Sequence, residues 1–261
     1  MEKKVDYALW LSEIRKSNSK YSPLFVGKKA NPPIFFFGDP ENAAGATICL
    51  NPSATEFENR KWDLECIELS ALLERCRNYF NMPEHVPRHQ WFEKWEPFLE
   101  KIGVSYCASP RVIHLDLSPR ATLSVSSLQK SKQLQDLFLD LVENDLKYLF
   151  GQLRAYPSLK YLYLMGSVTK KYYAIEFLRK NAQRLGYVLN PIVPFKRGGP
   201  GQVGLYMIDL GDPILRYLFF CSTSPSDPNS STQALLLSRA QWLLEHYPEF
   251  LPSGACAVCS K

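Results

Sequence analysis

The sequence predicts an α/β protein with a three-layer α/β/α architecture, in which a central, mainly parallel twisted sheet lies between helices. Short apolar runs rich in β-forming residues alternate with longer segments of helical periodicity, which is typical of a parallel sheet covered on both faces. The chain has 261 residues, of which 46% are hydrophobic and 22% are charged, and these values suit one large domain. We expect a single domain over residues 1–261, with an N-terminal extension over about residues 1–30 and a tail over about residues 250–261.

The expected strands are short apolar runs that contain many β-branched and aromatic residues. They are Ile34–Phe37, Ala46–Leu50, Arg111–Leu115, Tyr161–Met165, Val188–Val193, Leu205–Ile208 and Tyr217–Cys221. The expected helices are longer segments with apolar residues at i, i+3 and i+4, as at Leu134, Leu137 and Leu141. They are Val5–Ile14, Leu64–Phe80, Trp91–Ile102, Leu134–Leu153, Thr169–Leu185 and Gln233–Tyr247.

Composition limits the compartment and the partners. The net charge of +5 permits a polyanionic partner but does not require one. No run approaches the ~20 apolar residues of a membrane span, and the N-terminus lacks the apolar core of a signal peptide. We therefore expect a cytoplasmic protein with no membrane partner, and cysteines scattered among apolar neighbours fit a reducing compartment.

Cysteine and histidine residues do not form a recognisable metal motif. Cys256 and Cys259 have the spacing of zinc ligands, but no second ligand pair completes the set. His114 lies inside an expected strand, where a histidine with satisfied hydrogen bonds in the core is the favoured interpretation. We expect no metal site and no other cofactor.

Polar residues typical of loops directly follow four of the expected strands. In open α/β sheets, ligands bind beyond the carboxyl ends of the strands, so we expect these four ends to border one shared crevice. The segments are Asn51-Pro52-Ser53, Asp116-Leu117-Ser118-Pro119, Gly166-Ser167 and Ser222-Thr223-Ser224-Pro225.

Asn51 stands between an expected strand and Pro52. The proline fixes its own φ and keeps Asn51 out of the helical region. A carboxamide on such a stiff turn can accept a hydrogen bond from a water molecule and orient it. Asn-Pro is also a common way to open a turn, and that interpretation suffices when the motif stands alone.

The segment Ser222–Asn229 provides a second motif. It follows an apolar strand, contains two prolines, and offers hydroxyl and backbone N–H groups to phosphates. A strand that ends in Asn-Pro-Ser and a late strand that ends in Ser-x-Ser-Pro together resemble the two signature motifs of the uracil-DNA glycosylase superfamily. The branch with Asn-Pro in the first motif includes mismatch-specific and single-strand-selective enzymes. The resemblance includes Tyr161–Gly166 as the family's strand before a helix, and it covers roughly residues 30–245.

The resemblance implies a uracil-DNA glycosylase-like fold and roles for several residues. Asn51 matches the residue that orients the hydrolytic water. Ser53 matches a position where the strict uracil enzymes have a tyrosine that excludes bulk at C5 of the base, and serine leaves that space open. Phe57, or alternatively Trp62, would supply the ring that stacks on the extruded base. Ser224 and Pro225 match the family's Ser-Pro pair.

Two matched positions depart from the family pattern. Ser222 stands where the family usually has a histidine that supports charge on the leaving base, so catalysis would depend on an activated base or on another donor such as Ser224. The candidate catalytic residues are therefore Asn51, Ser222 and Ser224. Asp116 stands where the family commonly has an asparagine that reads the pyrimidine edge. An aspartate repels O4 of uracil but accepts from the 4-amino group of cytosine. A solvated carboxylate that caps a turn is the alternative interpretation of Asp116.

Basic residues are concentrated between Lys170 and Arg197, where seven basic residues and one acid, Glu176, give a local charge of 7 − 1 = +6. Lys196 and Arg197 stand beside glycines that allow a phosphate backbone to approach closely. We expect both to contact DNA, together with Pro225 and Ser226. A solvated helix face followed by a flexible hairpin loop is the alternative. The seven are Lys170, Lys171, Arg179, Lys180, Arg184, Lys196 and Arg197.

These features predict a metal-free, monofunctional DNA glycosylase that acts on double- or single-stranded DNA and needs no obligate protein partner. The small Ser53 and the acidic Asp116 favour a 5-substituted or hypermodified cytosine of the kind found in phage DNA, which would make the protein an antiviral defence factor. Three alternatives remain open: a uracil-DNA glycosylase of base-excision repair, a catalytically silent DNA-binding module of the same fold, and a hydrolase of free nucleosides.

Overall fold

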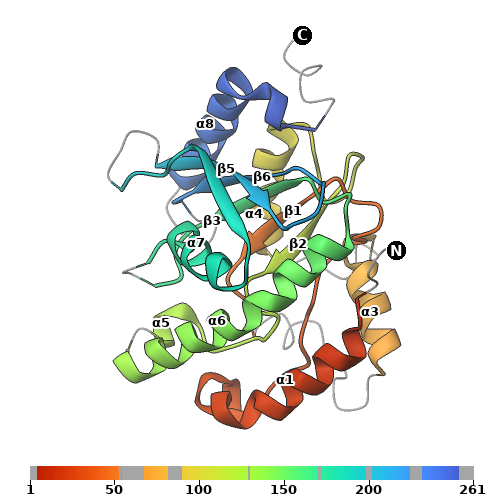
Figure 1. Cartoon of the computed structure of the whole chain (residues 1–261), viewed down its shortest axis with the longest axis vertical. Helices are drawn as coiled ribbons and strands as arrows, with labels where there is room; N and C mark the ends of the chain where they lie inside the picture. Colours follow the sequence, from red (N-terminus) through yellow and green to blue (C-terminus); the bar gives the residue numbers. More distant parts are fainter. Residues whose placement is uncertain are drawn as a thin grey trace.

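The computed structural model describes residues 5–52, 54, 68–81, 90–128, 130–169, 172–197, 202–223 and 231–252. These residues form an α/β fold around a six-stranded sheet with the order β2-β1-β3-β6-β5-β4 (Figure 1). Strands β2, β1, β3 and β6 are mutually parallel, whereas β5 runs antiparallel to both of its neighbours, β6 and β4. The expected, mainly parallel sheet is therefore confirmed. The strands are β1 (Gly45–Cys49), β2 (Val112–Asp116), β3 (Tyr161–Met165), β4 (Val188–Val193), β5 (Val203–Asp209) and β6 (Arg216–Cys221).

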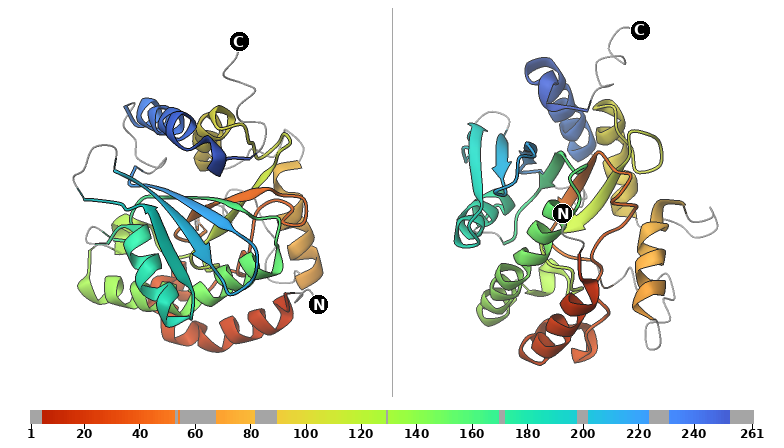
Figure 2. Two further views of the ribbon diagram at one scale, coloured as in Figure 1. Left: turned by 45° about the horizontal axis from the view of Figure 1, so that its top comes forward. Right: turned by 45° about the vertical axis from the view of Figure 1, so that its right-hand side comes forward.

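Helices cover both faces of the sheet and complete the three layers (Figure 2). On one face α4 (Gln90–Lys101) packs with α8 (Ser231–His246), and on the other α6 (Lys132–Ala155) packs with α1 (Tyr7–Tyr21) and α7 (Ala174–Arg184). No described helix combines the length and the apolar character needed to cross a membrane. The other described helical segments are α3 (Leu69–Arg77), the short α5 (Val125–Leu128) and the 3-10 turns η1 (Ser22–Leu24), η2 (Val26–Lys28), η3 (Tyr79–Asn81) and η4 (Pro248–Phe250).

Side chains that alternate along the strands pack against the two helical layers. On the α4 side, the ring of Phe98 stacks on Phe219 of β6 and meets Tyr163 of β3 edge-on, with both centroid distances at 5.9 Å. On the opposite side, Ile14 and Tyr21 of α1 are buried, and α1 packs against α6. The residues of α1, which lie within the expected N-terminal extension, therefore form part of the helical layer.

The expected strand at Ile34–Phe37 is wrong. This run is buried beside β2, but its only β-pairing with a described residue is a single antiparallel bridge between Phe37 and His114. The two prolines that precede the run have no N–H donors. Directly after it, Gly38 adopts a positive φ of 98° and turns the chain away from β2. The residues before and after the run therefore prevent longer pairing with β2, although the apolar pattern of the run suits a strand.

Three helices differ from the expected bounds by several residues. Helix α1 continues to Tyr21 instead of ending at Ile14. Helix α7 begins at Ala174 instead of Thr169, because the Glu176 carboxylate accepts a hydrogen bond from the N–H of Tyr173 (3.2 Å) and caps the first turn there. Of the expected helix Leu64–Phe80, the described part forms α3, which ends before the 3-10 turn η3.

Candidate functional site

The carboxyl ends of the parallel strands β2, β1, β3 and β6 lie side by side in the sheet. Each of these ends leads into one of the polar segments predicted from the sequence. Backbone hydrogen bonds join neighbouring ends: the N–H of Ser118 donates to the carbonyl of Leu50 (3.0 Å), and that of Gly166 to the carbonyl of Cys221 (2.9 Å). The four strand ends are therefore neighbours in the sheet, while the crevice that they were expected to share stays a prediction.

The carboxamide of Asn51 is held in one orientation just beyond β1. Its Nδ2 donates to the carbonyls of Pro52 (3.0 Å) and Arg120 (3.3 Å) and to the hydroxyl oxygen of Thr122 (3.1 Å). Because carbonyl oxygens can only accept, the nitrogen has to face them, and Oδ1 points the other way. No described residue donates to this Oδ1. The half-buried side chain thus presents one fixed, available acceptor.

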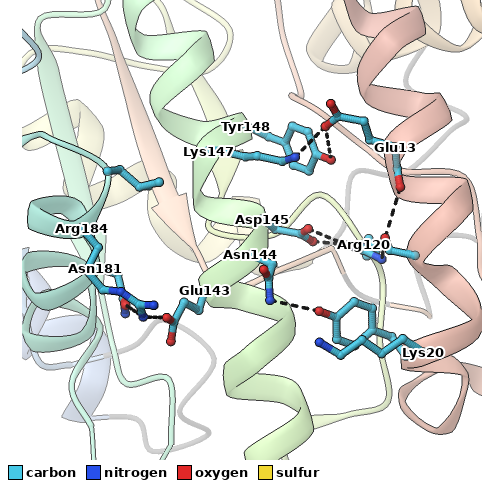
Figure 3. Close-up of a pocket in the computed structure, with 13 residues that line it drawn as sticks. Glu13, Lys20, Arg120, Glu143, Asn144, Asp145, Lys147, Tyr148, Asn181 and Arg184 are labelled. Carbon is cyan, nitrogen blue, oxygen red and sulfur yellow. Dashed lines mark hydrogen bonds and ion pairs between the residues drawn. The ribbon is translucent and has the colours of Figure 1, made fainter.

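A buried ion pair anchors the loop that holds Asn51. The guanidinium of Arg120 donates twice to Asp145 of α6, from Nε to Oδ2 at 2.9 Å and from Nη2 to Oδ1 at 2.6 Å (Figure 3). Ser118 also donates to Asp145 (2.6 Å), and Nη1 of Arg120 donates to Ser17 of α1 (3.0 Å). Burial raises the pKa of the Asp145 carboxyl above its ordinary value, while hydrogen bonds from Arg120 and Ser118 oppose that shift. These contacts fix the Arg120 carbonyl between α1 and α6.

Neither Arg120 nor Asp145 is among the residues predicted from the sequence. Asp145 does carry a usable signal, because it interrupts the buried apolar stripe of α6 between Leu141 and Leu149. A carboxylate on such a stripe needs a buried partner. The helical periodicity gives no information about that partner, which lies 25 residues earlier in the chain.

Asp116 ends β2 as a buried carboxylate, only 5% exposed, and is thus not the solvated carboxylate of the alternative interpretation. Its Oδ1 lies 3.3 Å from Nε2 of His114, and Nδ1 of that ring lies 2.9 Å from the Thr47 hydroxyl. The Thr47 hydroxyl lies 2.7 Å from the Tyr106 hydroxyl. Both ring nitrogens of His114 therefore have partners, as expected for a core histidine. The imidazole orients Oδ1 of Asp116, whereas no described residue donates to Oδ2.

Cys49 lies next to Asp116 across the β1–β2 pair. Burial, together with the negative charge of Asp116, raises the pKa of the Cys49 thiol to about 12. The thiol is therefore protonated at neutral pH and is not a nucleophile. The polar side chains at this end of β1 and β2 are therefore the Asp116 carboxylate and the Asn51 amide, without a thiolate from Cys49.

Ser222, which directly follows β6, is hydrogen-bonded to Gln202, which directly precedes β5. Ser222 donates to Gln202 twice, from its N–H to the backbone carbonyl (3.1 Å) and from its hydroxyl to Oε1 (2.6 Å). The hydroxyl proton of Ser222 is thus engaged within the protein. It has to leave Gln202 before Ser222 can act as a catalytic hydroxyl.

The two predicted DNA-contacting cations differ in their surroundings. Both Lys196 and Arg197 are exposed. Arg197 forms an ion pair with Glu176 of α7, with Nε 2.7 Å from Oε1, and its guanidinium lies 5.3 Å from the ring centroid of Tyr173. Lys196 makes no ion pair with a described residue. Glu176, the one acidic residue of the basic segment Lys170–Arg197, thus neutralises Arg197. Lys196 is therefore more available than Arg197 to contact a phosphate.

Several residues predicted from the sequence lie outside the described residues. They include one predicted catalytic residue, two predicted base contacts with the alternative stacking ring, and two predicted DNA contacts. They are Ser224, Ser53, Phe57, Trp62, Pro225 and Ser226.

A cavity of about 500 Å³ lies between α1, α6 and α7 (Figure 3). The strand-end residues Asn51, Asp116 and Ser222 do not line it, and it borders the other side of the Arg120–Asp145 ion pair. Most of its charged lining side chains are paired with one another, so their charges offer little to a ligand. The pairs are Glu13–Lys147, Glu143–Arg184 and Arg120–Asp145.

Within the described part of the chain, no group of three or more His, Cys, Asp or Glu side chains is placed to hold a metal ion. Searches of protein-family models, of curated proteins and of solved structures found no match for this chain. The resemblance to uracil-DNA glycosylases therefore depends on the strand-end motifs of the sequence alone.

Proposed function

We propose that the protein is a monofunctional DNA glycosylase of the uracil-DNA glycosylase superfamily, which hydrolyses the N-glycosidic bond of an extruded pyrimidine. The observation that carries this proposal is the fixed carboxamide of Asn51 at the carboxyl end of β1, with Oδ1 available, beside the buried carboxylate of Asp116 at the end of β2. An oriented acceptor for water and an oriented acceptor for a base edge on adjacent strands suit this chemistry.

The reaction needs a water molecule placed at C1′ of a flipped nucleotide. Oδ1 of Asn51 would accept a hydrogen bond from this water and direct its lone pair towards C1′. The C1′–N bond breaks with development of an oxocarbenium-like sugar, the water oxygen bonds to C1′, and the released proton ends on the departing base or in solvent. An abasic site remains in the DNA. Holding the water in this geometry supplies much of the rate enhancement.

Asp116 supports a cytosine-like base as the substrate. Its Oδ1 is occupied by His114, and Oδ2 is the oxygen that would accept from the exocyclic 4-amino group. The same oxygen would repel O4 of uracil. With the small side chain at position 53, this favours a 5-substituted or hypermodified cytosine, as found in phage DNA, and hence a role in antiviral defence.

A catalytically silent DNA-binding module is the second candidate function. The observation that favours it is the absence of a histidine at position 222 together with the engagement of the Ser222 hydroxyl by Gln202. Such a module would bind DNA but leave every N-glycosidic bond intact.

The test is an abasic-site assay on labelled duplex and single-stranded oligonucleotides. The bases are uracil, hypoxanthine, 5-hydroxymethylcytosine and glucosylated 5-hydroxymethylcytosine, with unmodified cytosine as the control, and alkaline cleavage reveals abasic sites. Cleavage at a modified cytosine is expected. Cleavage at uracil alone would indicate the repair enzyme, and DNA binding without any cleavage would indicate the silent module. Hydrolysis of the free nucleosides without cleavage in DNA would indicate the nucleoside hydrolase.

Replacing Asp116 by asparagine should reverse the base preference. Asparagine has the same size and can donate to O4, so activity on uracil should rise relative to the modified cytosine by about 5–150-fold, which corresponds to 1–3 kcal/mol of discrimination. The measurement is the ratio of kcat/KM on the two oligonucleotides. Thermal unfolding of the variant checks that its contact with His114 is retained. An unchanged ratio would remove Asp116 from the role of base reader.

A further inference from the structure

Arg239 is a charged residue on the buried stripe of α8. Leu236, Ala240 and Leu243 are each no more than 1% exposed, and Arg239 stands among them at the helical spacing that faces inward. Its guanidinium lies near the thiol of Cys221, the last residue of β6: burial raises the pKa of this thiol, and the charge of Arg239 opposes that shift. The arginine thus projects from α8 onto the carboxyl end of β6, the strand whose end belongs to the candidate site.

The guanidinium of Arg239 has no acidic partner in the described part of the chain. Its Nε is buried and makes no hydrogen bond there. Arg216 also has a buried Nε without a hydrogen-bond partner, but its Nη1 contacts Asp212 at 2.7 Å. Arg120 contacts Asp145 at 2.6 Å, so both of these buried arginines have the acidic partner that Arg239 lacks among the described residues. A buried donor without a partner is rare in a folded protein. An arginine in this state is suited to an anion that arrives from outside.

The separation between the strand ends near Arg239 and at Asp116 indicates how long a ligand must be to contact both residues. Asp116 ends β2 and Cys221 ends β6, and β1 and β3 lie between these two strands. Three steps between neighbouring strands correspond to about 14 Å. Of the two intervening strands, β3 leads into Gly166, which has no side chain to fill the space and adopts a positive φ of 85°. One nucleotide with hydrogen bonds at both ends spans such a gap.

We propose that Arg239 is a substrate-binding residue that holds a backbone phosphate of the extruded nucleotide while Asp116 holds the far edge of its base. This inference rests on the proposed function, and it identifies one charged contact of the same site. A planar guanidinium matches a phosphate with two parallel hydrogen bonds. With the nucleotide clamped at both ends, C1′ lies between them, near the end of β1 that carries Asn51.

The test measures the binding of a fluorescent single-stranded oligonucleotide that carries one 5-hydroxymethylcytosine. Arg239→Met should weaken binding by about tenfold to hundredfold and lower the slope of log K against log salt by about 0.7. Methionine suits the buried stripe, so the variant is expected to fold. Arg239→Lys, which keeps the charge but not the fork, should recover part of the affinity. Arg154→Met is the matched control, because this exposed arginine lies near the far end of α6, and it should leave binding unchanged.

Oligonucleotides with one uncharged methylphosphonate, placed on either side of the modified base, identify the phosphate. At one of the two positions, the methylphosphonate should lower the affinity of the wild-type protein for the oligonucleotide but leave the affinity of Arg239→Met unchanged. If each methylphosphonate lowers the affinity of both proteins by the same factor, the inference is overturned and the proposed function stands. The same holds if Arg239→Met has a lower kcat but the affinity of the wild-type protein. Failure of the wild-type protein to bind any of these oligonucleotides would contradict both.

Discussion

Replacing Asn51 by alanine should lower the rate of base excision by about 10²–10³-fold, because the variant loses the acceptor that orients the attacking water. Oδ1 is the half of the carboxamide that no described residue uses, whereas Nδ2 bonds Arg120 and Thr122. The loss should therefore fall on kcat more than on DNA affinity. Single-turnover kinetics on a 5-hydroxymethylcytosine oligonucleotide, with a separate binding titration, measures the two effects.

Asn42→Ala is the matched control for this variant. Asn42 is exposed, precedes the amino end of β1, and bonds Asp39 through its Nδ2 at 2.6 Å, so its replacement should leave kcat unchanged. Far-UV circular dichroism and thermal unfolding establish that both variants are folded. Full activity of Asn51→Ala would exclude the water-orienting role of the carboxamide.

Replacing Asp145 by alanine should reduce the free energy of unfolding by about 3–5 kcal/mol, because the variant leaves the Arg120 guanidinium buried without its counter-charge. The two side chains are 1% and 4% exposed, and they make two hydrogen bonds to each other. Ser118 loses its acceptor in the same variant. Urea denaturation at neutral pH measures the loss.

Two further variants test the cause of this loss. Asp136→Ala removes an exposed carboxylate from the same helix and should change stability by no more than about 0.5 kcal/mol. The double variant Arg120→Met with Asp145→Leu replaces both charges by apolar groups and should recover most of the stability. A loss for Asp145→Ala no larger than that for Asp136→Ala would show that the ion pair has little effect on the fold.

The same double variant tests whether the ion pair positions Asn51. Its fold is expected to survive, but the Arg120 carbonyl that accepts from Asn51 Nδ2 is then no longer held by charged contacts to α6. Excision should therefore slow while DNA affinity stays near that of the wild-type protein. Equal rates for the two proteins would assign the ion pair to stability alone.

The sequence by itself determined the kinds and order of most elements and the row of polar strand ends. Periods of two and of 3.6 residues are local properties, and α6 and β1 follow them closely. Asn51 was identified for the same reason, since a strand end followed by Pro52 is readable from neighbouring residues. The orientation of its carboxamide was not, because the acceptor carbonyl of Arg120 lies 69 residues away.

Only the tertiary structure decided which side chains meet. It replaced the expected strand Ile34–Phe37 by a single bridge, joined Arg120 to Asp145, and neutralised Arg197 with Glu176. It also showed that Arg239, one more basic residue in the sequence, is half-buried with a buried Nε and has no acidic partner among the described residues. These outcomes depend on how layers pack and on which groups lose water when they do, and neither is encoded in the local pattern around any one residue.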